Sequence, residues 1–319
     1  MIILDKSEIK HLLDGLDLVS PIKEGFKQYS KGKCIIPPVA ELLFDNPPGD
    51  VHIKYGYTTN EKYYVIKIAS GFPKNEELNI SNGQGMILLF DQRTGQPLIT
   101  LIDDAMLTDI RTAIAGQICT EMFANKIKNI GVIGTGRQAR LQVRYLKNVT
   151  DCRIVNVWGR NKKKSQKYKE DLLKYGFDVK ISKSVKELAK ISNLIITTTS
   201  SEEPLLHESD IKLGTHITAV GADTTSKNEL DISILKRADL IITDSISQCK
   251  VRGEISHALL KNLISSDEVI ELGSILSGMR RGRTSKDQIS VADLTGVAVQ
   301  DLQIAKAVYE KYLKVKNEI

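Results

Sequence analysis

The stretch Ile130-Gly131-Val132-Ile133-Gly134-Thr135-Gly136-Arg137-Gln138-Ala139 decides the fold, because it combines a short apolar strand with the pattern GxGxxA and the start of a helix. Gly134 permits a tight turn, Gly136 lets the backbone approach a pyrophosphate, and Ala139 lets the helix pack closely on the sheet. The amino terminus of the helix then offers free N–H groups and the positive end of its dipole to phosphate. The stretch predicts a dinucleotide-binding turn, with a tight turn that binds nothing as the alternative.

Short apolar runs alternate with helical stretches from about Asn125 onward. Strands are expected at Ile130–Ile133, Ile154–Trp158, Leu194–Thr198, His216–Val220 and Leu240–Thr243, and helices at Arg137–Asn148, Lys162–Tyr175, Val185–Ile191 and Ile232–Lys236. Strands that are apolar on both faces and separated by helices are typical of a parallel, doubly wound sheet. Residues 125–296 are therefore predicted to form an α/β domain of Rossmann type that binds a dinucleotide.

The residues before this domain follow another pattern, in which strands outnumber helices. Residues 6–31 have helical spacing that is broken near Pro21, and strand-like runs follow at Val51–Thr58, Tyr63–Ala69, Met86–Asp91 and Pro97–Ile102. The amphipathic stretch Val297–Lys316 predicts a terminal helix that packs back on this half. We expect a second, discontinuous α+β domain made of residues 1–124 and 297–319.

The composition is that of a folded chain of about two domains. The sequence has 319 residues, of which 41% are hydrophobic and 26% charged, and this composition argues against extensive disorder. The net charge of +6 is too small to indicate a nucleic-acid partner. No apolar run approaches the ~20 residues that span a bilayer, and charge begins at Asp5. We therefore expect no membrane partner, no signal peptide and a cytoplasmic location.

The cysteines and histidines do not have the spacing of metal ligands. Cys34, Cys119, Cys152 and Cys249 are far apart and form no CxxC pair, so neither a structural zinc site nor a disulfide framework is expected. His207, His216 and His257 are predicted to be surface or hydrogen-bonded core residues. No metal site is predicted.

The end of the second strand bears on the choice of cofactor. An acidic residue there would bind the ribose 2′-hydroxyl of NAD, but the sequence has Gly159-Arg160-Asn161, and an arginine accommodates a 2′-phosphate. We predict a preference for NADP(H), with NAD(H) as the second cofactor. The alternative is that Arg160 and the lysines at 162–164 are only the solvated start of a helix.

Two cations lie where apolar residues are expected. Lys67 interrupts a strand that is apolar on both faces, and a buried ammonium group requires an anion or a route to water. Arg111 follows Thr108, which we predict to cap an alanine-rich helix with Arg111 in its first turn. An arginine there can bind a carboxylate through two hydrogen bonds. The alternatives are that Lys67 extends to the sheet edge and that Arg111 pairs with Asp103, Asp104 or Asp109.

Asp223 is the candidate acid. It follows the strand ending at Val220, and ligands of doubly wound sheets bind at the carboxyl ends of strands. Asp223 is therefore predicted to hold a substrate amine and to exchange a proton with it. The alternative is that it caps the turn near Thr224 and Thr225.

Taken together, these residues resemble the ornithine cyclodeaminase/mu-crystallin family over nearly the entire chain. The matching blocks are Val65–Phe72, Leu107–Ala113, Gly134–Ala139, Gly214–Asp223 and Asp293–Asp301. The resemblance implies a Rossmann domain with a substrate-binding and dimerisation domain built from both termini, and a homodimer. It also implies that Lys67 and Arg111 bind the α-carboxylate of a small amino or imino acid, that Asp223 handles its amine, and that Thr295-Gly296 lies beside the nicotinamide.

The predicted site is completed by this resemblance. Lys67 and Asp223 are the expected catalytic residues, and Lys67, Arg111, Lys54 and Asp223 the expected substrate-binding residues. The residues predicted to contact the dinucleotide are Thr112, Gly134, Thr135, Gly136, Arg137, Gln138, Ala139, Gly159, Arg160, Asn161, Thr198, Thr199, Val220, Gly221, Thr295 and Gly296.

The sequence departs from the family at two places. Many members have an arginine after the prolines near residue 38, where this chain has Val39, so one carboxylate contact is either absent or supplied by Lys54 or His52. Arg160 replaces the acid that binds the ribose in NAD-dependent cyclodeaminases, and a preference for NADP(H) suits net reduction of an imine.

We predict hydride transfer at the α-carbon of an amino or imino acid, either as reduction of an imine or ketimine to an amino acid or as conversion of ornithine to proline. The alternatives are an amino acid dehydrogenase similar to alanine dehydrogenase, and a protein of mu-crystallin type that binds NADPH and a small ligand without turnover.

Overall fold

The computed structural model describes residues 1–317 and divides into two compact units. Unit 1 contains Met1–Arg111 and the chain from Val297 onward, and unit 2 contains Thr112–Gly296. The first division falls inside helix α3, Met106–Phe123. The predicted domain boundary after residue 124 follows the end of this helix and stays a prediction, and residues 318–319 of the predicted terminal segment lie outside the described residues.

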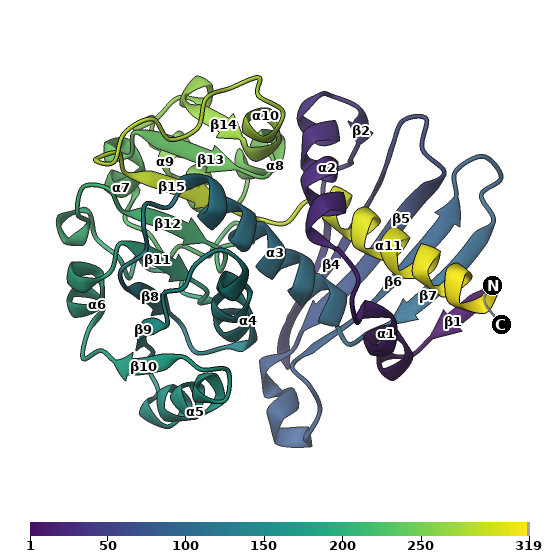
Figure 1. The fold of residues 1–319 in the computed structure, drawn as a ribbon, viewed down its shortest axis with the longest axis horizontal. Helices are drawn as coiled ribbons and strands as arrows, with labels where there is room; N and C mark the ends of the chain where they lie inside the picture. The colour runs from purple at the N-terminus through teal and green to yellow at the C-terminus, as the bar shows by residue number, and fades with distance from the viewer. Residues whose placement is uncertain (318–319) are drawn as a thin grey trace. The chain divides into compact units, whose positions relative to one another are not determined.

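Unit 2 is built on an eight-stranded sheet with the order β10-β9-β8-β11-β12-β15-β13-β14, in which every pairing is parallel (Figure 1). The strands are β8 Ile130–Ile133, β9 Ile154–Trp158, β10 Asp178–Ile181, β11 Leu194–Thr197, β12 His216–Ala219, β13 Leu240–Thr243, β14 Val269–Glu271 and β15 Ser290–Asp293. The helices are α4 Arg137–Tyr145, α5 Lys162–Leu173, α6 Val185–Ile191, α7 Ile232–Arg237, α8 Ile246–Cys249, α9 Glu254–Leu260 and α10 Leu272–Leu276. The predicted doubly wound fold is confirmed.

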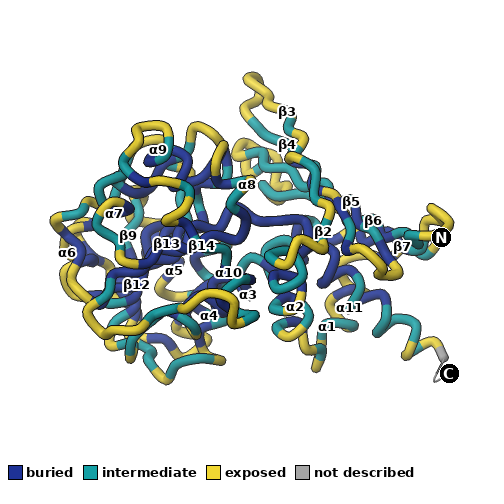
Figure 2. The backbone as a smooth tube through the Cα atoms, turned by 90° about the horizontal axis from the view of Figure 1, so that it is seen from above, coloured by how far each residue is buried: buried dark blue, intermediate teal, exposed yellow. Residues whose placement is uncertain are grey.

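Apolar residues on both faces hold this sheet in place. Leu194 and Ile196 of β11 join one core cluster, whereas Ile195 between them joins the other. A strand with side chains alternating between two apolar cores must be covered by helices on both sides. Figure 2 shows the strands of this sheet in the buried interior of the unit.

Unit 1 is a seven-stranded sheet with helices against one face. Its strand order is β1-β7-β6-β5-β4-β2, with β3 also paired to β4. The strands are β1 Ile2–Leu4, β2 Cys34–Ile35, β3 Ala40–Asp45, β4 Pro48–Thr58, β5 Tyr63–Gly71, β6 Gly83–Asp91 and β7 Pro97–Ile102, and the helices include α1 Lys6–Leu13, α2 Val19–Ser30 and α11 Ala298–Asn317. Helix α11 packs against α1, α2 and strands β4, β5 and β6 (Figure 1). The predicted packing of the terminal helix on the first half of the chain is therefore confirmed.

Two details of the predicted helices are wrong. The break in residues 6–31 lies between α1 and α2, around Gly15 with its φ of +69°, and Pro21 lies in the first turn of α2. Helix α3 begins at Met106, so Thr108 is inside the helix and does not cap it. Asp103 has the capping role, since its carboxylate accepts hydrogen bonds from the N–H groups of Ala105 and Leu107 at 3.2 and 2.6 Å. Arg111 consequently lies in the second turn.

Within residues 1–317 no helix is both long enough and apolar enough to cross a membrane. All four cysteines are free, as expected from their spacing.

Candidate functional site

Lys54 and Lys67 form a buried pair of like charges in unit 1. They are directly opposite each other in the register of β4 and β5, so their side chains share the covered face of the sheet. Only 5% of Lys54 and 2% of Lys67 is exposed, so the alternative that Lys67 extends to the sheet edge is wrong. Two opposed, buried ammonium groups disfavour each other and favour an anion near them. The covered face of this sheet therefore concentrates positive charge.

Arg111 is a third buried cation of unit 1, and 4% of it is exposed. Its Nε donates to Oδ1 of Asp301 at 3.0 Å, and its Nη1 donates to Oε1 of Gln300 at 3.3 Å. The predicted alternative partners Asp103, Asp104 and Asp109 are not the ones that form this ion pair. Asp301 and Gln300 thus hold the guanidinium group at two of its nitrogens, Nε and Nη1. These contacts fix the orientation of Arg111.

The loop before α3 is tied to the same sheet. The N–H of Asp103 donates to the carbonyl of Gly85 at 3.4 Å, and Gly85 pairs with Ala69, two residues beyond Lys67 on β5. His52, on the same face of β4, is paired with Glu41 at 2.6 Å. Of the two residues considered as replacements for the absent arginine, His52 is thus hydrogen-bonded to Glu41, and Lys54 is opposite Lys67.

The glycine turn of unit 2 has the geometry that a pyrophosphate requires. Gly134 has a φ of +117°, and a Cβ on it would lie 2.4 Å from Oγ1 of Thr198. A Cβ on Gly136 would meet nothing within 4 Å, so open space lies beside the backbone where α4 begins. The cap residue Gly136 makes no side-chain hydrogen bond to the start of this helix, and helix amino termini are suited to phosphate. These residues fit a dinucleotide.

The remaining predicted dinucleotide residues of this region lie on α3, on α4 and between β9 and α5. Gly159 cannot carry a side chain without displacing Thr135, because its Cβ would lie 2.7 Å from Cγ2 of that residue. Asn161 caps α5 by accepting from the N–H of Lys164 at 3.1 Å, and Arg160 before it is exposed. The other members are Arg137, Gln138 and buried Ala139 in the first turn of α4, and Thr112 in α3.

Carboxylates that the sequence analysis missed organise the other loops at this edge of the sheet. Asp244, directly after β13, accepts from the N–H groups of Thr295 and Gly296 at 3.4 and 2.6 Å. Glu229 accepts from the N–H groups of Thr199 and Gly221 at 2.5 and 2.9 Å. The signal for Asp244 was present, since it follows a parallel strand as Asp223 does, whereas no local pattern distinguishes Glu229.

Asp223 lies in the loop after β12 and buried Val220, and 34% of its side chain is exposed. Lys227 Nζ donates to its Oδ1 at 2.6 Å. Arg252 Nη1 donates to its carbonyl at 3.0 Å. A carboxylate held by one ammonium group and still reached by solvent can accept or release a proton.

Burial changes the acidity of several groups in unit 2. Desolvation raises the pKa of Glu229 to about 7 and that of Asp293 to about 8. Desolvation, assisted by Arg283, lowers the pKa of His216 to about 3. His216 is hydrogen-bonded to Ser290 at 2.9 Å and Thr218 at 3.1 Å, which confirms a hydrogen-bonded core histidine.

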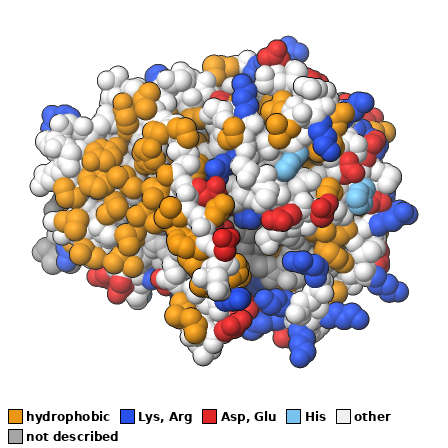
Figure 3. Space-filling view, turned by 180° about the vertical axis from the view of Figure 1, so that it is seen from behind, with side chains coloured by type: hydrophobic (Ala, Val, Ile, Leu, Met, Phe, Trp, Pro, Cys, Tyr) orange, Lys and Arg blue, Asp and Glu red, His pale blue; other side chains and the backbone are white. Residues whose placement is uncertain are grey.

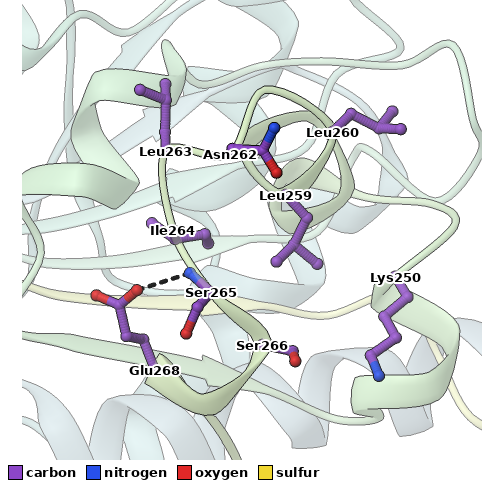
Figure 4. A pocket seen from close by; sticks show the side chains of 9 residues that line it. All are labelled: Lys250, Leu259, Leu260, Asn262, Leu263, Ile264, Ser265, Ser266 and Glu268. Atoms are coloured by element: carbon purple, nitrogen blue, oxygen red, sulfur yellow. Dashed lines mark hydrogen bonds between the residues drawn. The ribbon is translucent and has the colours of Figure 1, made fainter.

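One pocket of unit 2 lies apart from these residues in the chain. Figure 4 shows its lining around the end of α9, with the N–H of Ser265 donating to Oε2 of Glu268 at 2.6 Å. Its lining residues are Lys250, Leu259, Leu260, Asn262, Leu263, Ile264, Ser265, Ser266 and Glu268. None of the predicted site residues is among them.

Comparison with known proteins places these features in a family. The model of the ornithine cyclodeaminase/mu-crystallin family matches residues 1–316. An archaeal alanine dehydrogenase dimer with bound NAD is similar with a TM-score of 0.89 and 30% identity, covering 99% of this chain and 97% of the other. The iminosuccinate reductase of Paracoccus denitrificans in complex with NAD+ is similar with a TM-score of 0.88 and 30% identity, covering 99% of this chain and 97% of the other. The pyrroline-2-carboxylate reductase of Thermococcus litoralis, in complex with NADH and L-proline, has a TM-score of 0.92 and 26% identity, covering 99% of this chain and 98% of the other.

The open space beside Gly136 gives a test of the dinucleotide turn. We expect Gly136→Ala to weaken NAD(P)H binding by about tenfold or more, because a methyl group enters the space a pyrophosphate would use. Thermal unfolding should change little, since nothing surrounds that position. Fluorescence titration and thermal denaturation measure the two effects.

Gly131→Ala is the matched control, because its Cβ would lie 2.5 Å from Cδ2 of Leu188 and 2.7 Å from Oγ of Ser192. Overpacking there should cost about 1–3 kcal/mol of unfolding free energy. If Gly136→Ala destabilises the fold as much and leaves cofactor affinity unchanged, the turn is structural only.

Proposed function

The chain belongs to the ornithine cyclodeaminase/mu-crystallin family, and we propose that it reduces the C=N bond of an imino acid to give an amino acid. It is an NAD(P)-dependent enzyme, as are the relatives that match almost its entire length. Two of these relatives are named as reductases of imino acids.

The observation that carries the proposal is the buried pair of Lys54 and Lys67, with Arg111 as the third cation of the same unit. A carboxylate neutralises opposed ammonium groups and accepts a charge-assisted hydrogen bond from a guanidinium edge. Asp301 and Gln300 accept hydrogen bonds from Nε and Nη1 of Arg111, so the guanidinium is oriented before a ligand arrives. A small acid that carries a carboxylate is therefore the ligand best suited to unit 1.

Each group of residues has a separate role in the proposed reaction. Lys54, Lys67 and Arg111 bind the carboxylate and so fix the α-carbon, and positioning of this kind contributes about 7–11 kcal/mol to catalysis. The glycine turn, Arg160 and the loops at Thr198, Gly221 and Thr295 hold the dinucleotide, which supplies the hydride to the α-carbon when bound. Asp223 delivers the proton that the imine nitrogen takes up, and Lys227 beside it stabilises the resulting carboxylate.

A panel of substrates tests the direction of the reaction. With NADPH or NADH we expect steady oxidation of the cofactor with a cyclic imino acid, or with a keto acid and ammonia. Conversion of ornithine to proline without a net change in cofactor would identify a cyclodeaminase instead. Reduction of NAD+ by alanine without activity on any imine would identify an amino acid dehydrogenase.

Replacement of Lys67 tests the carboxylate site. With the best substrate of the panel, Lys67→Met should lower kcat/KM by about two to three orders of magnitude, because a buried charged contact to the carboxylate is lost. The affinity for NAD(P)H, measured by fluorescence, should stay within about twofold. Lys62→Met, the same change at an exposed lysine nearby, is the control and should behave as wild type. Equal kcat/KM for all three proteins would contradict the assignment of Lys67.

We also propose that NADP(H) is the preferred cofactor, on the basis of Arg160. The residue is exposed and directly precedes the cap of α5, and no acid occupies the position. Arg160→Ala should weaken NADPH binding by about 10- to 100-fold and leave NADH binding unchanged, since only NADPH carries the 2′-phosphate. Lys169→Ala, further along α5, serves as the control. A wild-type protein that binds NADH more tightly than NADPH would refute this preference.

A homodimer through the open face of the unit 1 sheet is part of the proposal. Apolar residues form rows across the strands on the face opposite α11; one row is Ile53, Ile68, Met86 and Ile102, and a second contains Tyr55, Ile66 and Leu88. Figure 3 shows hydrophobic side chains gathered on one side of the molecule. A broad apolar surface of this kind is typical of an interface. The related archaeal alanine dehydrogenase is described as a dimer, which favours a second copy of this chain as the partner.

Light scattering after size exclusion tests the dimer. Wild type should have the molar mass of two chains. Met86→Lys should lower the molar mass toward that of one chain, because an ammonium group would be buried in the interface. Leu173→Lys, an exposed apolar residue on α5, is the control and should not change the mass. A monomeric wild type, or a dimer unaffected by Met86→Lys, would contradict this interface.

A further inference from the structure

Glu229 is a fully buried carboxylate that joins the ends of two neighbouring strands. Its Oε1 accepts from the N–H of Thr199, after β11, at 2.5 Å. Its Oε2 accepts from the N–H of Gly221, after β12, at 2.9 Å and from Oγ1 of Thr197 at 2.7 Å. All three partners are donors, so each oxygen of the carboxylate must act as an acceptor.

The two strand ends are in close contact at this carboxylate. A Cβ on Gly221 would lie 2.2 Å from the carbonyl oxygen of Thr199 and 2.4 Å from Oε2 of Glu229. Only glycine fits at this position, because a side chain would push the loop away from Glu229. The contact therefore closes a loop that begins at Gly221 and returns to Glu229.

This closed loop carries Asp223. The N–H of Asp223 donates to the carbonyl of Gly221 at 3.2 Å, so the position of Asp223 depends directly on that of Gly221. Lys227, which pairs with the Asp223 carboxylate at 2.6 Å, lies on the returning part of the same loop. The acid and its cation are thus both held between the two ends that Glu229 ties together.

A second buried carboxylate fixes Glu229 itself. Glu254, at the start of α9, accepts from the N–H groups of Glu229 at 2.7 Å and Leu230 at 3.1 Å, and from Nδ2 of Asn228 at 2.6 Å. Asp293 in turn accepts from the N–H of Ile255 in the first turn of α9 at 2.9 Å. The loop end that carries Glu229 is therefore anchored to β15 through α9.

We infer that Glu229 is a positioning residue for Asp223, which sets the path of the 221–229 loop by accepting hydrogen bonds from both strand ends at once. The inference rests on the proposed role of Asp223 and goes beyond it, since Glu229 is fully buried and would act on Asp223 only through the loop. A carboxamide cannot replace it: the amide NH2 of glutamine would face one of the two N–H donors whichever way the group turned.

Hydrogen exchange and steady-state kinetics of Glu229→Gln, both on the full chain, test this role. We expect faster amide exchange in residues 197–201 and 220–224, with exchange in β8 and its turn unchanged. With the best substrate of the panel, kcat should fall by about tenfold or more while KM stays within about twofold, because unit 1 still binds the carboxylate. A residue needed only for stability would not separate kcat from KM.

Thr197→Val is the matched control. It removes one hydrogen bond to Glu229 but leaves both backbone N–H contacts, so exchange in residues 220–224 and kcat should match wild type. If Thr197→Val and Glu229→Gln have the same effects, the role of Glu229 is packing and the inference is overturned. Unchanged exchange in residues 220–224 of Glu229→Gln overturns it as well.

Two further measurements apply if Glu229→Gln does not fold or if wild type shows no turnover. If Glu229→Gln does not fold, Glu229→Asp keeps the charge but shortens the arm, and the inference requires it to raise exchange in residues 220–224. If wild type turns over no member of the panel, the proposed function fails, while the exchange measurements still decide whether Glu229 holds the loop.

Discussion

The buried opposition of Lys54 and Lys67 is the constraint on which the functional account depends. Neighbouring strands place two ammonium groups face to face on the covered side of a sheet, where apolar residues occupy the next register positions, Val65, Ile87 and Leu101. Such a pair weakens the fold unless negative charge offsets it. The proposed carboxylate site depends on this pair, with Arg111, hydrogen-bonded to Asp301, as its third cation.

Unit 2 has the opposite electrostatic character at the carboxyl edge of its sheet. Asp244, Glu229, Glu254 and Asp293 are buried there and accept hydrogen bonds from backbone N–H groups of the loops. Glycines such as Gly221 lie where two backbone segments approach closely, so no apolar side chain fits there. Buried carboxylates hold these loops instead, through hydrogen bonds to backbone N–H groups. Burial raises the pKa of Glu229, Glu254 and Asp293, since it disfavours the charged form.

Much of the fold was predictable because its strands are apolar on both faces. The ranges Ile130–Ile133, Ile154–Trp158 and Leu240–Thr243 agree with β8, β9 and β13 at both ends. Strands β1, β2, β3, β10 and β14 escaped prediction because they are short or largely exposed. Strand β15 escaped although it is buried, because its four residues begin with Ser290 and end with Asp293. The start of α3 was misplaced because Asp103 caps the helix across Asp104 and Ala105, which both have positive φ. Residue propensities do not indicate this geometry.

The residues of the candidate site were predictable from the sequence, but the residues that hold them in place were not. Lys67, Arg111 and Asp223 were distinguishable as polar residues in apolar or strand-end positions. Asp301, which holds Arg111, lies 190 residues away in sequence, and its connection exists only after α11 packs on the sheet. The role of Glu229 likewise depends on two strand ends that the fold brings together.

The most direct measurement of the central claim is calorimetric titration of the NADPH-loaded protein with the amino acid product and, separately, with its carboxamide. The two ligands have the same shape and differ in the negative charge that the buried cations would neutralise. The account predicts that the acid binds and that the carboxamide binds at least about a hundredfold more weakly. Equal affinity for both ligands would contradict it.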